Sequence, residues 1–137
     1  MKRILIMGLP GSGKTMLAKE LQDKLNCPWF NADVVREQFN DWDFSPEGRI
    51  RQAHRMRTLA DNCPNDPQYV ICEFVCPLPE MREIFDADYT VWVDTENEGR
   101  FDNTNNVFQP PIDYDYRVVT KECKKWSTVL ANKIKDI

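Results

Sequence analysis

Eight residues near the start of the chain have the types and spacing of a phosphate-binding loop. The sequence Gly8-Leu9-Pro10-Gly11-Ser12-Gly13-Lys14-Thr15 matches G-x-x-x-x-G-K-[ST], in which backbone N–H groups surround phosphate oxygens. Glycines permit the tight turn that brings these N–H groups together. Lys14 would neutralise the β- and γ-phosphates, and the Thr15 hydroxyl would bind Mg²⁺. We therefore predict a site for ATP or GTP, rather than a glycine turn that binds nothing.

The residues around this loop have the patterns of a strand and a helix. Residues 4–7 form a continuous apolar run, typical of a strand buried on both faces of a parallel sheet. Residues 16–25 carry apolar side chains at helical spacing. A helix in that position directs the positive end of its dipole toward a bound anion. Strand, loop and helix together are the context in which the motif binds phosphate.

Strands and helices are predicted to alternate along the rest of the chain. We expect strands at 27–30, 69–75, 89–93 and 116–119, helices at 34–39, 46–62, 77–85 and 120–134, and irregular structure at 96–111. Ser45 with Pro46, and Thr120, are the expected starts of two helices. This alternation predicts one α/β domain over residues 1–137, with a three-layer α/β/α arrangement of the P-loop NTPase type and a parallel sheet of about five strands.

Asp33 follows the short second strand, at the edge of the sheet where open α/β proteins bind ligands. A hydroxyl that accepts a phosphoryl group needs a neighbour that takes its proton and holds it in line. An aspartate in this place suits both tasks. The alternative is that Asp33 caps the next helix, where aspartate is favoured; the two interpretations are compatible.

Arg36 and Arg49 flank a loop that carries Trp42 and Phe44. Guanidinium groups bind phosphate and sulfate oxygens in bidentate pairs, and aromatic rings stack on purines. The combination indicates a second ligand that is anionic and contains a base. Gln52 shares the side of its helix with Arg49. The alternative is a solvated basic helix face beside buried rings.

Glu73 and Arg100 each allow two interpretations. Glu73 lies in an apolar strand, where a charge is costly unless it is compensated. It could reach Mg²⁺ through water, pair with an arginine, or face solvent at the strand end. Arg100 lies after the fourth strand, where a closing segment could bring it to the transferring phosphate. Its alternative is a loop arginine in water.

For five other residues, the sequence favours a structural role over a catalytic or binding role. Cys76 has no partner spaced to activate it as a nucleophile, so we expect packing. His54, the only histidine, is expected at the surface. The charge run Arg51, Arg55 and Arg57 is expected to face solvent.

Composition and charge narrow the classes of partner. The formal net charge of −4 argues against nucleic acid as the main partner. Five cysteines with one histidine and no C-x-x-C pair do not form a zinc motif, so free thiols in a reducing cytoplasm are expected. The apolar runs are too short to cross a membrane. The oligomeric state is left open.

The ordered set of these segments resembles the adenylylsulfate kinase (APS kinase) family. That family uses Mg-ATP to phosphorylate the 3′-hydroxyl of adenosine 5′-phosphosulfate. Its G-L-S-G-A-G-K-T is similar to residues 8–15, its D-G-D-N-V-R to 31–36, its F-S-x-x-x-R-x-x-N to 44–52, its F-I-S-P to 74–77, its V-D-T to 93–95, and its Y-E-x-P to 108–111.

The resemblance implies a role for each matching residue. Asp33 would approach the acceptor hydroxyl, and Phe44 would stack on the substrate adenine. Arg36 and Arg49 would hold the phosphosulfate. The remaining matching positions, Gln52, Phe74 and Val75, would belong to the same substrate pocket.

Some positions depart from the family pattern. Asn31 replaces an acid, Gln52 replaces an asparagine, and Cys76 replaces a serine, which excludes a phosphoserine and leaves direct in-line transfer. The stretch after Thr95 is short and lacks the family's basic run. Two alternatives therefore stay open beside an APS kinase. One is a kinase for another nucleotide, a nucleoside or a polynucleotide end, and the other is a nucleotide-binding module with little catalysis.

Overall fold

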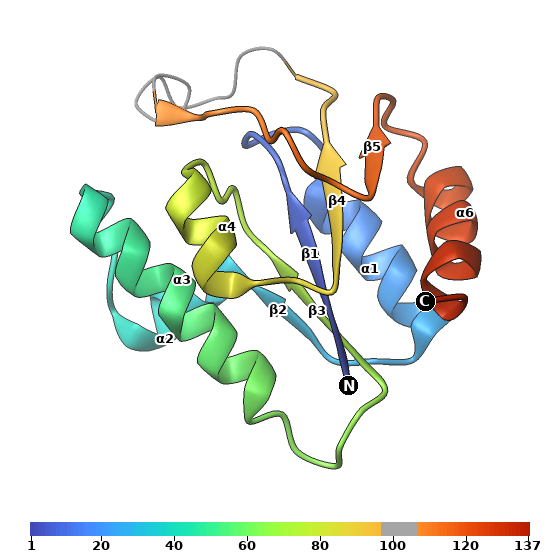
Figure 1. Ribbon diagram of the computed structural model, residues 1–137, viewed down its shortest axis with the longest axis horizontal. Coiled ribbons are helices and arrows are strands. Elements are labelled where there is room, and N and C mark those ends of the chain that lie inside the picture. Colours follow the sequence, from blue (N-terminus) through green and yellow to red (C-terminus); the bar gives the residue numbers. More distant parts are fainter. Residues whose placement is uncertain (97–106) are drawn as a thin grey trace.

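Five parallel strands form the centre of the molecule, and helices cover both faces of the sheet (Figure 1). The computed structural model describes residues 1–96 and 107–137. The strands are β1 (Lys2–Met7), β2 (Trp29–Asn31), β3 (Tyr69–Glu73), β4 (Tyr89–Val93) and β5 (Tyr116–Val118). The helices are α1 (Lys14–Leu25), α2 (Ala32–Phe39), α3 (Pro46–Asp61), α4 (Pro79–Phe85) and α6 (Cys123–Lys135).

The strand order is β2-β3-β1-β4-β5, and every neighbouring pair is parallel. The central strand β1 pairs with β3 on one side and with β4 on the other. Because each parallel pair needs a crossover, helices must cover the sheet. The predicted α/β class, with a parallel sheet of five strands between helices, is confirmed.

Strand β1 contributes to two hydrophobic cores because its side chains alternate between the faces of the sheet. Ile4 and Ile6 belong to the core beneath α1 and α6. Leu5 and Met7 belong to the core beneath α3 and α4. All four side chains are at most 1% exposed, which explains the uninterrupted apolar run. Figure 1 shows α1 and α6 together on one face and α3 and α4 on the other.

The helix starts confirm one predicted cap and correct another. The Ser45 hydroxyl accepts a hydrogen bond from the Gly48 N–H at 3.2 Å, and Pro46 opens α3. Helix α6 begins at Cys123 rather than after Thr120, so the predicted Thr120 cap is wrong. The Thr120 hydroxyl instead donates to the Glu122 carboxylate and accepts from the Trp126 indole, both at 2.8 Å.

The sheet register brings two polar strand ends together at one edge. Glu73 pairs with Ile6 of β1 and with Asn31 of β2. Since β1 runs directly into the glycine-rich loop, the loop, Asn31 and Glu73 meet beyond the carboxyl ends of the strands. Ligands bind at this edge in open α/β sheets. None of the helices in the described ranges is long and apolar enough to span a bilayer.

Candidate active site

The glycine-rich loop has the tight shape that its sequence predicts. A Cβ on Gly8 would lie 2.3 Å from the Val93 carbonyl oxygen, so the close passage of the loop beside β4 requires glycine. Gly13 has φ of 98° and immediately precedes α1. The buried Lys14 side chain donates from Nζ to the Leu9 carbonyl at 3.0 Å. The first turn of α1 and its lysine thus face the space that the loop encloses, which fits a triphosphate.

Glu73 is the acceptor at the centre of a hydrogen-bond network beside this loop. Its carboxylate accepts from the Thr15 hydroxyl at 2.8 Å, from the Asn31 amide at 2.9 Å and from the Trp29 indole at 3.2 Å. Glu73 is only 4% exposed, so the solvent-facing interpretation is wrong. Within residues 1–96 and 107–137 these three donors are neutral side chains, and no arginine pairs with Glu73 there.

The donor set around Thr15 fits a hard divalent cation. A hydroxyl and a carboxylate are oxygen ligands of the kind that Mg²⁺ prefers. The hydrogen bonds to the buried Glu73 carboxylate described above come from neutral groups, and a cation near Thr15 would stabilise it further. No cluster of three or more His, Cys, Asp or Glu suited to a metal occurs in residues 1–96 and 107–137.

Asp33 lies in the first turn of α2, but it does not cap the helix. The Asn31 side-chain oxygen caps α2 by accepting from the N–H groups of Asp33 and Val34, at 2.9 and 3.1 Å. The capping interpretation of Asp33 is therefore wrong. Its exposed carboxylate lies at the wall of the same cavity as Lys14 and Thr15.

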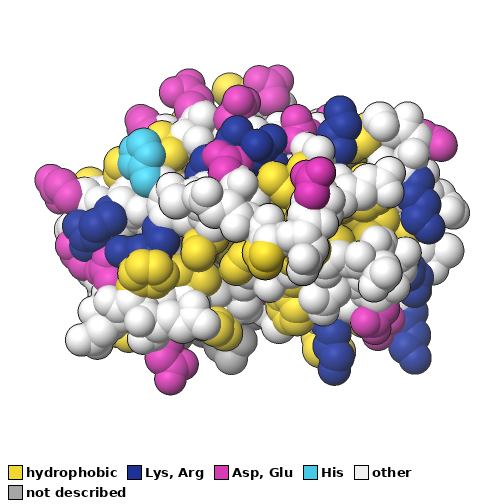
Figure 2. All heavy atoms as spheres, turned by 90° about the horizontal axis from the view of Figure 1, so that it is seen from below, with side chains coloured by type: hydrophobic (Ala, Val, Ile, Leu, Met, Phe, Trp, Pro, Cys, Tyr) yellow, Lys and Arg dark blue, Asp and Glu magenta, His cyan; other side chains and the backbone are white. Residues whose placement is uncertain are grey.

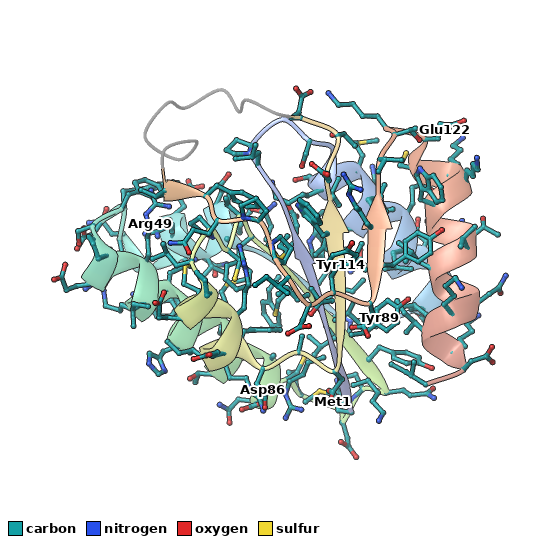
Figure 3. The ribbon with its side chains drawn as sticks, turned by 45° about the horizontal axis from the view of Figure 1, so that its top comes forward. Met1, Arg49, Asp86, Tyr89, Tyr114 and Glu122 are labelled. Atoms are coloured by element: carbon teal, nitrogen blue, oxygen red, sulfur yellow. The ribbon has the colours of Figure 1, made fainter. Side chains whose placement is uncertain are left out.

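Arg36 and Arg49 are buried, and both guanidinium groups lie against the ring of Phe44. They are 4% and 6% exposed, and their Cζ atoms lie 4.4 and 5.4 Å from the ring centroid. Burial lowers the pKa of both guanidinium groups. A solvated basic face is therefore the wrong interpretation for these two arginines. Figure 3 shows Arg49 near the start of α3.

One cavity of about 640 Å³ connects the glycine-rich loop to these groups. It brings together all the residues that the resemblance assigned to the substrate. Their catalytic and binding roles stay predictions. Gly8, Leu9, Ser12 and Gly13 complete the loop outside the lining, and Arg100 lies outside the described residues. The lining consists of Pro10, Gly11, Lys14, Thr15, Asn31, Ala32, Asp33, Arg36, Trp42, Phe44, Arg49, Gln52, Glu73, Phe74 and Val75.

Gln52 and Phe74 contact other parts of the protein as well as the cavity. The Gln52 amide donates to the Ala32 carbonyl at 3.2 Å and accepts from Arg55 at 2.7 Å. Gln52 is 2% exposed, and its hydrogen bond to Ala32 connects α3 to the start of α2. Phe74 packs edge-on against Phe85, with ring centroids 5.7 Å apart. Both residues therefore help to shape the wall of the cavity.

Three residues with structural interpretations can now be placed. Cys76 is buried, and burial raises the pKa of its thiol to about 12. The thiol is therefore unreactive, which agrees with a role in packing. His54 is exposed, as expected (Figure 2). Arg57 donates from Nη1 to the carbonyls of Phe85 and Asp86, so a purely solvated role for it is wrong.

Sequence reasoning missed two residues near the cavity. Trp29 donates to Glu73, and the available signal was its position two residues before Asn31, on the same face of a strand. Asp41 pairs with Arg51 and Arg55, so these arginines are not simply solvated either. The sequence feature that could have indicated the role of Asp41 was an acidic residue in a loop that precedes a basic helix face.

The comparisons with known proteins support the fold. The chain matches an APS kinase from Mycobacterium tuberculosis, solved with AMPPNP and APS, at 20% identity over 98% of this chain and 97% of that one, with a TM-score of 0.85. A sugar kinase from Janibacter sp. HTCC2649 matches at 14% identity over 100% and 95%, with a TM-score of 0.71. Shikimate kinase from Acinetobacter baumannii, solved with shikimate, matches at 15% identity over 99% and 94%, with a TM-score of 0.65.

These likenesses show that the chain has the fold of P-loop kinases that act on different acceptors. No protein among the curated sequences matches it. The sequence pattern of the AAA domain family (AAA_18) matches residues 4–106, which include the glycine-rich loop and β1 to β4. The chain therefore belongs to the AAA domain family.

Proposed function

We propose that the protein is an ATP-dependent kinase that phosphorylates the 3′-hydroxyl of adenosine 5′-phosphosulfate. One observation carries the proposal: two buried guanidinium groups and a half-exposed ring share a single cavity with the phosphate-binding loop. Guanidinium groups suit an anion such as a phosphosulfate, and the ring suits a base. The likeness to an APS kinase solved with AMPPNP and APS agrees with this assignment.

In the proposed reaction, the residues of the cavity have different roles. Lys14 and the loop N–H groups hold the β- and γ-phosphates of ATP. Asp33 orients the acceptor hydroxyl and accepts its proton as the hydroxyl oxygen bonds to the γ-phosphorus and the bond to the β-γ bridging oxygen breaks. Arg36 and Arg49 hold the acceptor's anionic group, and Phe44 holds its base.

Thr15, with Glu73 hydrogen-bonded to it, forms the part of the site that would hold Mg²⁺. A metal ion held there would supply Lewis-acid stabilisation of the charge on the transferring phosphate group. The Asn31 amide and the Trp29 indole fix the Glu73 carboxylate in place. Thr15 is thereby oriented before any ligand arrives.

A coupled assay tests the proposal directly. Purified protein is mixed with Mg-ATP and one acceptor at a time: adenosine 5′-phosphosulfate, other nucleotides, nucleosides, a polynucleotide end, shikimate or a sugar. We expect ADP release with adenosine 5′-phosphosulfate and a product carrying a 3′-phosphate. Clear turnover of another acceptor, with no turnover of adenosine 5′-phosphosulfate, would show that the other compound is the substrate. ATP binding without release of ADP under any condition would indicate a binding module instead.

Replacement of Glu73 by glutamine should raise the Mg²⁺ concentration needed for half-maximal activity by about 10-fold, because a carboxylate beside the metal ligand Thr15 loses its charge. The measurement is a magnesium titration at saturating ATP and acceptor. Glu83→Gln, which neutralises an exposed glutamate on α4, is the matched control. An unchanged magnesium requirement in a folded Glu73→Gln variant would show that the Glu73 carboxylate does not support metal binding.

A further inference from the structure

The carboxylate of Asp41 joins the loop between α2 and α3 to helix α3. Its Oδ2 accepts from Arg51 Nε and from Arg55 Nη2, each at 2.8 Å, and its Oδ1 accepts from Arg51 Nη2 at 3.1 Å. The side chain is only 13% exposed. These hydrogen bonds hold the pKa of Asp41 well below its usual range, so it is charged at neutral pH.

The same loop holds a guanidinium group of the acceptor cavity. Arg36 donates from Nη1 to the Asp41 carbonyl at 2.8 Å and to the Asp43 carbonyl at 3.2 Å. Its Nη1 also lies 4.0 Å from the Asp41 carboxylate. A displacement of Asp41 would therefore displace the partners of Arg36.

The ring of the cavity follows in the same stretch of chain. Phe44 lies three residues after Asp41, under the guanidinium groups of Arg36 and Arg49. Arg49 also donates to the Phe44 carbonyl at 2.8 Å. The position of the loop thus sets both the ring and one of the buried cations that line the cavity.

The charge of Asp41 also offsets repulsion among the arginines around it. Arg36, Arg49 and Arg55 lie close enough for the charges of Arg49 and Arg55 to lower the pKa of Arg36. The carboxylate of Asp41 acts on Arg36 in the opposite direction. Loss of this single negative charge would leave the like charges of these arginines facing one another with less compensation.

We propose that Asp41 is the positioning residue of the acceptor cavity, which sets acceptor affinity through Arg36 and Phe44 without touching the acceptor. The inference rests on the proposed kinase function. It predicts a selective effect, since the side-chain partners of Asp41 lie on α2 and α3, whereas the glycine-rich loop lies between β1 and α1. Misplacement of binding groups by about 1 Å reduces the efficiency of a reaction by up to about 10²-fold.

The test compares Asp41→Asn, Asp41→Ala and Asp41→Glu with a matched control, Asp61→Asn. Asp61 likewise accepts from two arginines, Arg3 at 2.6 Å and Arg57 at 3.0 Å, but in the described residues it has no hydrogen bond to Arg36 or to the loop before α3. Steady-state rates are measured with each substrate varied in turn. Asp41→Asn should raise the KM for adenosine 5′-phosphosulfate by about 10-fold or more, with the KM for ATP and kcat within about twofold.

The other variants complete the expected pattern. Asp41→Ala should show the larger loss, Asp41→Glu should restore part of the affinity because it keeps the charge, and Asp61→Asn should leave both KM values unchanged. Thermal unfolding followed by circular dichroism shows whether each variant is folded at the assay temperature.

Several outcomes would overturn the inference. If Asp41→Asn behaves like Asp61→Asn, or raises both KM values equally, Asp41 does not position the acceptor groups. If neither the Asn nor the Glu variant is folded, its role is general stability and the inference is wrong. In each case an active wild-type protein shows that the proposed function itself stands. A wild-type protein inert toward every acceptor would instead reject the function, and the inference with it.

Discussion

Replacement of Lys14 by alanine is expected to reduce phosphoryl transfer by about 10³-fold, because a preorganised cation at the transferring group is lost. Lys14 is 8% exposed and lies at the first position of α1, with its Nζ bound to the Leu9 carbonyl. A positive charge held in a buried place interacts more strongly with phosphate than one in water. The rate of ADP formation at saturating ATP and acceptor is the measurement.

Lys19→Ala is the matched control for this prediction. Lys19 lies on the same helix and is exposed, so its loss should leave the rate unchanged. A Lys14→Ala variant that remains folded and retains more than about a tenth of the activity would contradict the role of Lys14.

Replacement of Asp33 by asparagine should lower kcat by about 10²–10⁴-fold, the usual contribution of a general base. Helix α2 should be unaffected because Asn31, not Asp33, supplies its cap. The affinity for ATP should change little, since the proposed mechanism assigns the phosphate groups of ATP to the loop and to Lys14, not to Asp33. Single-turnover rates and ATP binding, measured separately, distinguish the two effects.

Glu37→Gln serves as the control for Asp33→Asn. Glu37 lies one turn further along α2 and is exposed, so the variant removes a negative charge from the same helix outside the cavity. It should have nearly normal kinetics. Equal losses of ATP affinity and kcat in Asp33→Asn would show that Asp33 supports the nucleotide site rather than the acceptor hydroxyl.

The elements around the glycine-rich loop could be predicted because their signals are local. The apolar run of residues 4–7 reports burial on both sides of a sheet, and Ser45 followed by Pro46 reports a helix start. Such patterns depend on residues a few positions apart. The parallel direction of the strands followed from their alternation with helices, but their order in the sheet did not.

Contacts between distant residues could not be predicted in the same way. Glu73 receives its three hydrogen bonds from α1 and β2, and the choice of neutral donors depends on the strand register. Asn31 and Asp33 are both residue types that cap helices well. Asn31 supplies the cap of α2 because β2 ends at that residue, beside β3. Thr120 was assigned from a local preference, but its hydroxyl is used by Glu122 and Trp126.

The arrangement of the cavity has a consequence for how acceptor preference could evolve. Five of the seven residues assigned to the acceptor come from one uninterrupted stretch between β2 and β3, and Phe74 and Val75 follow directly after β3. The five are Asp33, Arg36, Phe44, Arg49 and Gln52. The glycine-rich loop lies outside that stretch, between β1 and α1. Under the proposed function, exchange of this one segment between kinases of the same architecture would change most of the residues assigned to the acceptor and leave the glycine-rich loop unchanged.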